Sequence, residues 1–366
     1  MVEWKKLGEV CEVLRGKRLT KSQLSETDGY PVLHGGSTPM GFYTEYNRKA
    51  NTTVIVNTGN AGSVFFYDKE FWSSDACFSL YPNKEIIDKF LYLYVYGCEK
   101  ILKGKIRAGA MPTIDANAVE SLVVPIPSLS EQQRIVGILD TFTSSIENLK
   151  EQIAQRRKQY EYYRDQLLDL EGKEGVEMKT LGEIAKYRRG SFPQPYGNKE
   201  WYDGEGAMPF VQVADVEEHG RKLKEQTKQF ISKLAMPKSV YVPAGTVIVT
   251  LQGSIGKVAI TQYDSYIDRT LGIFEGYLID INKVYFALQL ERIFSIKKEK
   301  ARGGTIKTIT KEEFTNFSIP VPSLQEQQRI VSILDTFEAS INNLEQQLAQ
   351  REKQYEYYRN KLLTFE

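Results

Sequence analysis

VPIPSLSEQQRIVGILDTFTSSIENLKEQIAQRRKQYEYYRDQLLDLE, residues 124–171, recurs as IPVPSLQEQQRIVSILDTFEASINNLEQQLAQREKQYEYYRNKLLTFE, residues 319–366. At an offset of 195 the two segments agree at 33 of 48 positions. A repeat this close indicates one structural unit built twice, with something different attached to each copy. We therefore expect the protein to act in two similar places.

The repeats have the apolar spacing of long helices. In the first copy, one stripe of residues steps alternately by four and three through Ile135, Leu139, Phe142, Ile146, Leu149, Ile153, Arg156, Tyr160, Tyr163, Leu167 and Leu170. In the second copy the same steps lead through Ile330, Leu334, Phe337, Ile341, Leu344, Leu348, Arg351, Tyr355, Tyr358, Leu362 and Phe365. This spacing is typical of a coiled-coil seam. A helix of about forty residues is about 60 Å long, and the natural partner of each stripe is the other copy.

The start of each repeat has a turn-and-cap signature. Pro-x-Pro-Ser-Leu opens both copies, and a glutamate follows three residues after the serine, at Glu131 and Glu326. This arrangement resembles a capping box and predicts that the helix begins there.

The seam has one charged position, Arg156 and its counterpart Arg351. These arginines either fix the register of the helix pair or touch a partner protein. The register interpretation is favoured because buried polar seam residues commonly fix alignment. We likewise interpret Tyr160 and Tyr355 as aromatics that pack between helices rather than as part of a ligand site.

Length and composition set the broad class. At 366 residues the chain has room for two or three domains. Its first residues do not form a signal peptide, and its apolar runs are too short to span a bilayer. Three cysteines without CxxC spacing and only two histidines argue against a disulfide framework and a structural zinc site. We expect a soluble cytoplasmic protein, and the net charge of +1 by itself lowers the expectation of nucleic-acid binding.

The segments outside the repeats are two copies of one domain. VEWKKLGE at residues 2–9 recurs as VEMKTLGE at residues 176–183, and an Arg-Gly pair follows both at the same distance. Short β-branched runs separated by Gly, Asn and Pro turns predict strands. The apolar spacing of residues 84–103 and 280–300 predicts helices. Between the shared glycines and apolar residues the two copies differ almost everywhere, as two recognition surfaces of different specificity would.

We therefore predict an α+β chain in which two β-rich domains are separated by two long helices that pair within the chain. The expected parts are domain 1 at residues 1–123, the first repeat helix at 124–171, a linker at 172–175, domain 2 at 176–318 and the second repeat helix at 319–366.

Two glycine-rich turns, GNAGS at residues 59–63 and GSIGK at 253–257, invite a phosphate-loop interpretation. The Walker pattern is missing, because Leu251 stands where its first glycine is required and Val258 where Ser or Thr is required. Hairpin turns are the favoured interpretation. The alternative is that polar side chains present donors and acceptors to base edges, where Asn and Gln suit adenine and Arg and Lys suit guanine. The side chains concerned are Thr58, Asn60, Ser63, Gln252, Ser254 and Lys257.

The chain carries no recognisable catalytic motif. HExxH, GxSxG, paired carboxylates at a repeated position, the Asn/Asp-Pro-Pro-aromatic motif of amino methyltransferases and a helicase ATP loop are all missing from the sequence. We therefore expect a protein that binds rather than catalyses.

Two variable β-rich domains alternate with two near-identical helices, each entered through Pro-x-Pro-Ser-Leu-x-Glu-Gln-Gln-Arg-Ile-Val at residues 125–136 and 320–331. With the Leu-Gly-Glu openings at 7–9 and 181–183, this layout resembles the specificity subunit of a type I restriction–modification system over essentially the whole chain. The resemblance implies two target recognition domains, each reading one half of an interrupted DNA site. It also implies an antiparallel coiled coil with a pseudo-two-fold relation, which acts as a ruler for the gap.

The resemblance further implies partners and cofactors. Two methyltransferase subunits would dock on the helices and methylate adenine with S-adenosylmethionine. Restriction subunits, with ATP and Mg, would complete the complex on double-stranded DNA. The specificity subunit itself would bind no cofactor or metal and would not be a catalyst.

Candidate DNA contacts are polar and basic residues of the variable domains. In domain 1 they are Lys17, Arg18, His34, Ser37, Thr58, Asn60, Lys105 and Arg107. In domain 2 they are Arg188, Arg189, Gln212, Gln252, Ser254, Lys257, Arg302 and Lys307. The competing hypothesis is a coiled-coil scaffold that presents two protein-binding β domains and does not bind DNA.

Overall fold

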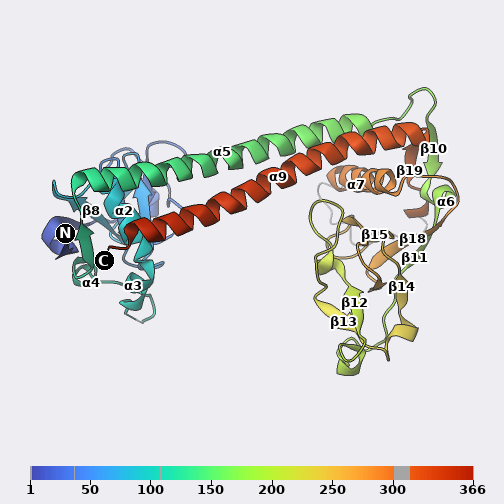
Figure 1. The fold of residues 1–366 in the computed structure, drawn as a ribbon, viewed down its shortest axis with the longest axis horizontal. Helices are drawn as coiled ribbons and strands as arrows, with labels where there is room; N and C mark the ends of the chain where they lie inside the picture. The colour runs from blue at the N-terminus through green and yellow to red at the C-terminus, as the bar shows by residue number, and fades with distance from the viewer. Residues whose placement is uncertain (1, 37, 108, 301–313, 366) are drawn as a thin grey trace. The chain divides into compact units, whose positions relative to one another are not determined.

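The computed structural model describes residues 2–36, 38–107, 109–300 and 314–365. It divides into two compact units: unit 1 consists of Met1–Glu151 with Glu345–Glu366, and unit 2 of Gln152–Leu344. Each unit contains one β-rich domain, together with a half of each long helix (Figure 1).

The two repeats form the helices α5 (Leu129–Leu168) and α9 (Leu324–Leu363). In unit 1 the ring of Phe142 stacks on Tyr358 with centroids 5.3 Å apart, and in unit 2 Phe337 stacks on Tyr163 at 5.4 Å. The beginning of one helix therefore packs against the end of the other in both units, which confirms the predicted antiparallel coiled coil. The two contacts are equivalent under the 195-residue offset.

Each long helix begins after a short strand. Strand β9 (Val123–Ile126) pairs with β1 (Glu3–Lys6), and β19 (Ser318–Val321) pairs with β10 (Glu177–Thr180), all antiparallel. The first residues of each repeat are thus strand rather than helix. The helix start itself departs from a full capping box. The Ser128 hydroxyl accepts the Glu131 N–H at 3.3 Å, but the carboxylate of Glu131 is bound by Arg134 at 2.6 Å.

A buried glutamine joins each long helix to its domain. The Gln132 amide donates to the carbonyls of Glu85 and Pro127 at 2.8 and 2.9 Å, and its oxygen accepts the Ile87 N–H at 2.8 Å. Gln327 repeats the pattern in unit 2, with bonds to Pro322 and Asn282. The repeated Glu-Gln-Gln-Arg sequence therefore contains a structural residue that satisfies backbone groups away from water.

We expect Gln132→Ala to lower the free energy of unfolding by about 2 kcal/mol, because it leaves buried backbone groups without partners. Urea denaturation of the full chain measures the change. The neighbouring exposed Gln133→Ala is the matched control and should shift the free energy of unfolding by less than about 0.5 kcal/mol. Equal effects of the two substitutions would contradict the structural role of Gln132.

The main sheet of unit 1 has the order β2-β8-β5-β6, and all its pairings are antiparallel. Its strands are β2 (Cys11–Arg15), β5 (Thr52–Val56), β6 (Val64–Tyr67) and β8 (Cys77–Pro82). A smaller sheet has the order β4-β3-β7, from β3 (Tyr30–Leu33), β4 (Phe42–Tyr43) and β7 (Trp72–Ser73). The helices are α1 (Leu7–Val10), α2 (Asp88–Gly97), α3 (Glu99–Gly104) and α4 (Ala116–Glu120), and a 3₁₀ turn covers Lys21–Gln23.

Unit 2 repeats this plan. Its main sheet has the order β11-β18-β15-β16, from β11 (Ala185–Arg189), β15 (Val247–Thr250), β16 (Val258–Ile260) and β18 (Leu271–Tyr277). The second sheet has the order β13-β12-β17-β14, from β12 (Met208–Val211), β13 (Gln229–Ile231), β14 (Val240–Val242) and β17 (Ser265–Ile267). The helices are α6 (Leu181–Ile184) and α7 (Lys283–Lys300), with 3₁₀ turns at Lys199–Trp201, Val213–Asp215 and Met236–Lys238.

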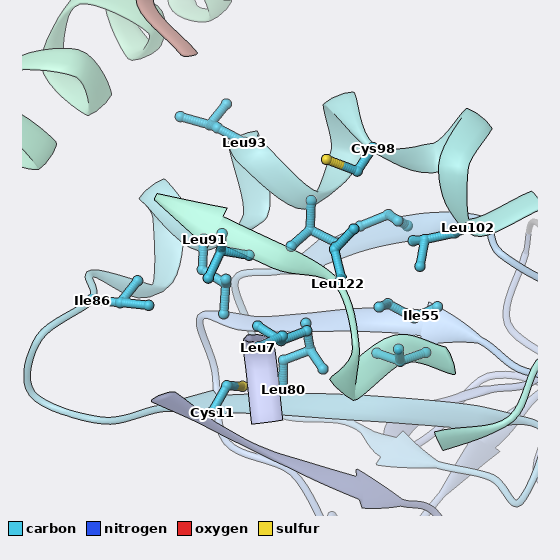
Figure 2. Packing of buried hydrophobic residues seen from close by; sticks show 14 of the residues in the cluster. Leu7, Cys11, Ile55, Leu80, Ile86, Leu91, Leu93, Cys98, Leu102 and Leu122 are labelled. Atoms are coloured by element: carbon cyan, nitrogen blue, oxygen red, sulfur yellow. The ribbon is translucent and has the colours of Figure 1, made fainter. Parts of the chain in front are cut away.

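The core of unit 1 lies between its main sheet and helices α2 and α3. Figure 2 shows Leu91 and Leu102 on the helix side, facing Ile55 and Leu80 of the sheet. The predicted helix at residues 84–103 is confirmed, although it is divided at Cys98 into α2 and α3. The predicted helix at 280–300 is confirmed as α7.

Close packing explains the glycine of the shared Arg-Gly pair. A Cβ on Gly16 would lie 2.2 Å from the carbonyl oxygens of Ser73 and Ser74. A Cβ on Gly190 would lie 2.2 and 2.4 Å from the carbonyl oxygens of Ile267 and Asp268. Only glycine allows β2 and β11 to leave the sheet so close to these backbones, which is why glycine recurs at this place in both domains.

Candidate nucleic-acid interface

In unit 1 three segments meet where β5 ends and β8 begins. We call residues 33–36, 57–60 and 74–76 the first loop cluster. Its backbone hydrogen bonds are Asn60 N–H to Gly35 O (3.0 Å), Asn57 N–H to Ala76 O (2.8 Å) and Ser74 N–H to Leu33 O (3.0 Å). A fourth segment adjoins it, since Gly59 N–H donates to Pro112 O and Ile114 N–H to Asn57 O.

Unit 2 holds the same arrangement at the end of β15 and the start of β18. We call residues 211–213, 251–254 and 268–270 the second loop cluster. Its backbone hydrogen bonds are Asp268 N–H to Val211 O (3.0 Å) and Leu251 N–H to Thr270 O (2.9 Å). These match two of the bonds in the first loop cluster, so the two clusters can be aligned residue by residue.

The alignment brings the predicted site residues into equivalent places. The equivalent pairs are His34 with Gln212, Thr58 with Gln252 and Asn60 with Ser254. Both glycine-rich turns connect antiparallel strands, β5 to β6 and β15 to β16, which confirms the hairpin interpretation. The two clusters therefore have one backbone plan and different side chains.

The structure brings four of the domain 1 candidates to the first loop cluster or its edge: His34, Thr58, Asn60 and Arg107. Asn60 is exposed, and the Thr58 hydroxyl donates to Asn57 at 2.7 Å. The Arg107 side chain is 75% exposed and forms an ion pair with Asp115. The Nδ1 atom of His34 is buried and has no hydrogen-bond partner among the described residues.

The other candidates of domain 1 lie elsewhere. The Lys105 ammonium donates to the Ala118 carbonyl and the Ser121 hydroxyl at the end of α4, so it is not directed freely toward a ligand. Lys17 and Arg18 are exposed in the segment after Gly16. Ser37 lies outside the described residues.

In domain 2 the second loop cluster contains Gln212 and Gln252, both half-buried, and the exposed Ser254. Lys257 lies at the far end of the turn and forms an ion pair with Glu218. Two further candidates, Arg188 and Arg189, are exposed on β11, and their backbones pair with β18. Arg302 and Lys307 lie outside the described residues.

The four helix candidates lie between α5 and α9. The guanidinium of Arg156 lies over Phe337 at 5.9 Å in unit 2, and that of Arg351 over Phe142 at 5.6 Å in unit 1. The Tyr160 hydroxyl donates to Glu338 at 2.7 Å. Tyr355 packs against the core of unit 1, and burial raises the pKa of its phenol.

Sequence reasoning missed two residues of the second loop cluster and its surroundings. Arg269 is exposed between Asp268 and Thr270, and its guanidinium lies 5.1 Å from the ring centre of Tyr196. Burial, and then the hydrogen bond to Asp268, raises the pKa of the Tyr196 phenol. An alignment of residues 73–76 with residues 267–270 would identify this turn as equivalent in the two domains. The two segments share no identical residue at equivalent positions, so the sequence alone does not reveal the alignment.

Three negative observations apply to the residues that the structure describes. No group of three or more His, Cys, Asp or Glu side chains could hold a metal ion there. Within the same residues, no helix has both the length and the apolar character of a membrane span. Cys11, Cys77 and Cys98 are buried and free, and burial raises the pKa of the Cys11 and Cys77 thiols to about 12.

Comparison with known protein families gives one match. The family described as "Type I restriction modification DNA specificity domain" matches residues 1–156 and 173–352. The chain is 30% identical over 389 residues to the type I restriction enzyme EcoR124I/EcoR124II specificity subunit of Escherichia coli, covering 100% of this chain and 94% of that protein. It is 28% identical over 386 residues to a putative type I specificity subunit of Haemophilus influenzae, covering 100% and 96%.

Solved structures show the same fold. The chain resembles the S subunit of a type I system from M. genitalium with a TM-score of 0.65 and 18% identity, covering 100% of this chain and 97% of that one. A chain from a study of complex assembly in the type I system gives a TM-score of 0.63 at 20% identity, covering 99% and 96%. At these identities the likeness supports the fold alone.

Proposed function

This chain belongs to the family of type I restriction–modification specificity subunits, and from that premise we propose that its two loop clusters each read one half of an interrupted DNA site. The protein is a DNA-recognition subunit and not itself a catalyst. Family membership therefore favours DNA recognition over the scaffold that does not bind DNA.

One observation carries the assignment to the loop clusters. Two equivalent backbone bonds build a cluster in each unit, yet equivalent positions hold different hydrogen-bonding side chains, Thr58 against Gln252 and Asn60 against Ser254. Base edges in the major groove are distinguished by their patterns of donors and acceptors. A constant scaffold with variable polar tips is suited to reading two different sequences.

A pair of exposed apolar sites, one in each unit, supports the proposed partner subunits. In unit 1, Trp4 and Leu129 expose 46% and 47% of their surface; in unit 2, the equivalent Met178 and Leu324 expose 45% and 49%. These apolar side chains lie on the paired short strands and at the starts of the long helices, not in the loop clusters. Their duplication supports the docking of two copies of one partner, which we propose to be the methyltransferase subunit.

The remaining parts of the complex complete the proposal. S-adenosylmethionine would be bound by the methyltransferase subunits, and ATP and Mg by restriction subunits, with no cofactor held by this chain. The protein would supply only the sequence specificity for adenine methylation on double-stranded DNA.

The test is to express the full chain with its methyltransferase subunit and map methylated adenines over a genome. The parent should methylate one interrupted motif. Thr58→Ala with Asn60→Ala should relax one half of the motif, and Gln252→Ala with Ser254→Ala only the other half. Each lost base contact should reduce discrimination by about 1–3 kcal/mol.

The controls are Lys84→Ala and Asp280→Ala, two exposed residues beyond the opposite ends of β8 and β18. They should leave the motif unchanged. If each pair of loop substitutions altered both halves, or neither, the assignment of one loop cluster to each half-site would be wrong.

A further inference from the structure

The turn between β17 and β18 is held rigidly at the centre of the second loop cluster. Asp268 is buried, and its Oδ1 accepts hydrogen bonds from the N–H and hydroxyl of Thr270 at 2.9 and 2.5 Å. Its Oδ2 accepts the Tyr196 hydroxyl at 2.5 Å. The backbone of this turn is also hydrogen-bonded to Val211 and Leu251. The residue between Asp268 and Thr270 is therefore presented on a fixed backbone.

That residue is Arg269. Its side chain is also held, by contact with the ring of Tyr196. The guanidinium lies 5.1 Å from the ring centre of Tyr196, within cation–π range. Tyr196 is in turn stacked on Phe192 with centroids 5.0 Å apart. Stacking on a fixed ring reduces the rotamer freedom that an exposed arginine would otherwise lose on binding.

The guanidinium of Arg269 is not neutralised by a carboxylate of the described residues, so it can pair with a ligand. It forms no ion pair with any of the residues that the structure describes, whereas Lys257 is paired with Glu218. The carboxylate next to it in sequence, Asp268, is already occupied by Tyr196 and Thr270. The planar guanidinium fork matches the O6 and N7 acceptors of guanine, and this is the commonest specific protein contact to a base.

The equivalent position in unit 1 holds a residue of opposite charge. The bonds Ser74 N–H to Leu33 O and Asp268 N–H to Val211 O align the two turns, so that Asp75 corresponds to Arg269. A carboxylate accepts hydrogen bonds from cytosine N4 but cannot donate to guanine. The two loop clusters thus differ most in charge at a position that the shared backbone holds in the same place.

We propose that Arg269 is a specificity-determining residue that reads a guanine in the half-site bound by the second loop cluster, with Tyr196 as its positioning residue. This rests on the function proposed above. It adds the base, the contacting group and the residue that orients it.

The experiment uses the full chain with its methyltransferase subunit and genome-wide mapping of methylated adenine. Arg269→Ala should lower the preference for guanine at one position of one half-site by about 10-fold to 100-fold. Arg269→Gln should move the preference at that position toward adenine, since Gln pairs with adenine N6 and N7. A change of preference cannot arise from unfolding, so this variant separates recognition from stability.

Tyr196→Phe keeps the ring and should retain the guanine, whereas Tyr196→Ala should weaken the preference. Lys238→Ala, which removes a cation lying 5.1 Å from the Trp201 ring, is the matched control and should leave the base preferences unchanged. The assignment would be overturned if Arg269→Ala left the motif unchanged. It would also be overturned if the substitution reduced methylation equally at all sites, as the loss of a phosphate contact would. A parent complex that methylates no interrupted motif would instead refute the proposed function as a whole.

Discussion

Removal of one heptad from each long helix, residues 147–153 and 342–348, is expected to shorten the gap between the two recognised half-sites by about 3 base pairs. Seven residues of α-helix span about 10.5 Å, and DNA rises about 3.4 Å per base pair. Seven residues are two turns, so the seam continues in phase from Ile146 to Arg156 and from Ile341 to Arg351. The aromatic stacks of Phe142 on Tyr358 and of Phe337 on Tyr163 are both retained.

Mapping methylated adenines with the shortened chain measures this gap directly. The matched control replaces the same two heptads with heptads that keep the seam residues and change only exposed positions, and it should keep the parental gap. Removing the heptad from one helix alone should instead destroy the pairing, because the stacks of the two units can no longer form together. An active shortened chain that still recognises the parental gap would refute the proposal that the helices set the spacing.

Arg221→Met is expected to lower the free energy of unfolding by about 3 kcal/mol. Arg221 lies at the tip of the hairpin 216–223, in the left-handed region at φ 51°, and its side chain is 6% exposed. Its guanidinium binds Glu338 of α9 at 2.5 Å, Glu291 of α7 at 3.2 Å and the Tyr160 hydroxyl of α5 at 3.2 Å. One side chain therefore ties the β domain of unit 2 to three helices.

The size of the effect follows from the two carboxylates that remain. Breaking a buried ion pair by removing one partner costs about 3–5 kcal/mol. The low end applies because the side chains of Glu291 and Glu338 are 26% and 25% exposed. Chemical denaturation followed by circular dichroism measures the change. Arg221→Lys, which keeps the charge but loses the fork, should be intermediate.

The pH dependence gives an independent check. Burial raises the pKa of the Glu291 carboxyl above its usual value near 4.5, and the Arg221 charge opposes that rise. In Arg221→Met the pKa should rise further. A raised carboxyl pKa stabilises the fold at low pH and loses that contribution as pH increases through it. The deficit of the variant should therefore grow as the pH rises above about 4.5. A deficit independent of pH would contradict this origin.

The coiled coil was predicted almost completely from the sequence. The seam of alternating four and three steps requires no tertiary information, because it belongs to neighbouring residues on one helix. The repeat at an offset of 195 is found by aligning the sequence with itself. The duplication of the β-rich domain was equally visible. The strand at the start of each repeat was missed, since Val123 to Ile126 and Ser318 to Val321 are strands only through pairing with β1 and β10.

The candidate site was predicted less well. The structure brings His34, Thr58 and Asn60 together in the first loop cluster, whereas Lys105 and Lys257 are engaged by their own domains. Basic character alone cannot separate a cation that awaits a ligand from one already paired, because the partner is distant in sequence. Lys105 and Ser121 are 16 residues apart, and Lys257 and Glu218 are 39 apart.

Local periodicity and internal repetition encode the two long helices, their pairing and the presence of two related domains, so all three follow from the amino-acid sequence. The meeting of the loops is a property of the folded chain. Residues 34, 58 and 75, and likewise 212, 252 and 269, are brought together by backbone hydrogen bonds, which every residue type except proline can donate. Such bonds leave no mark in the order of side chains, so Arg269 becomes visible as a candidate base reader only in the folded chain.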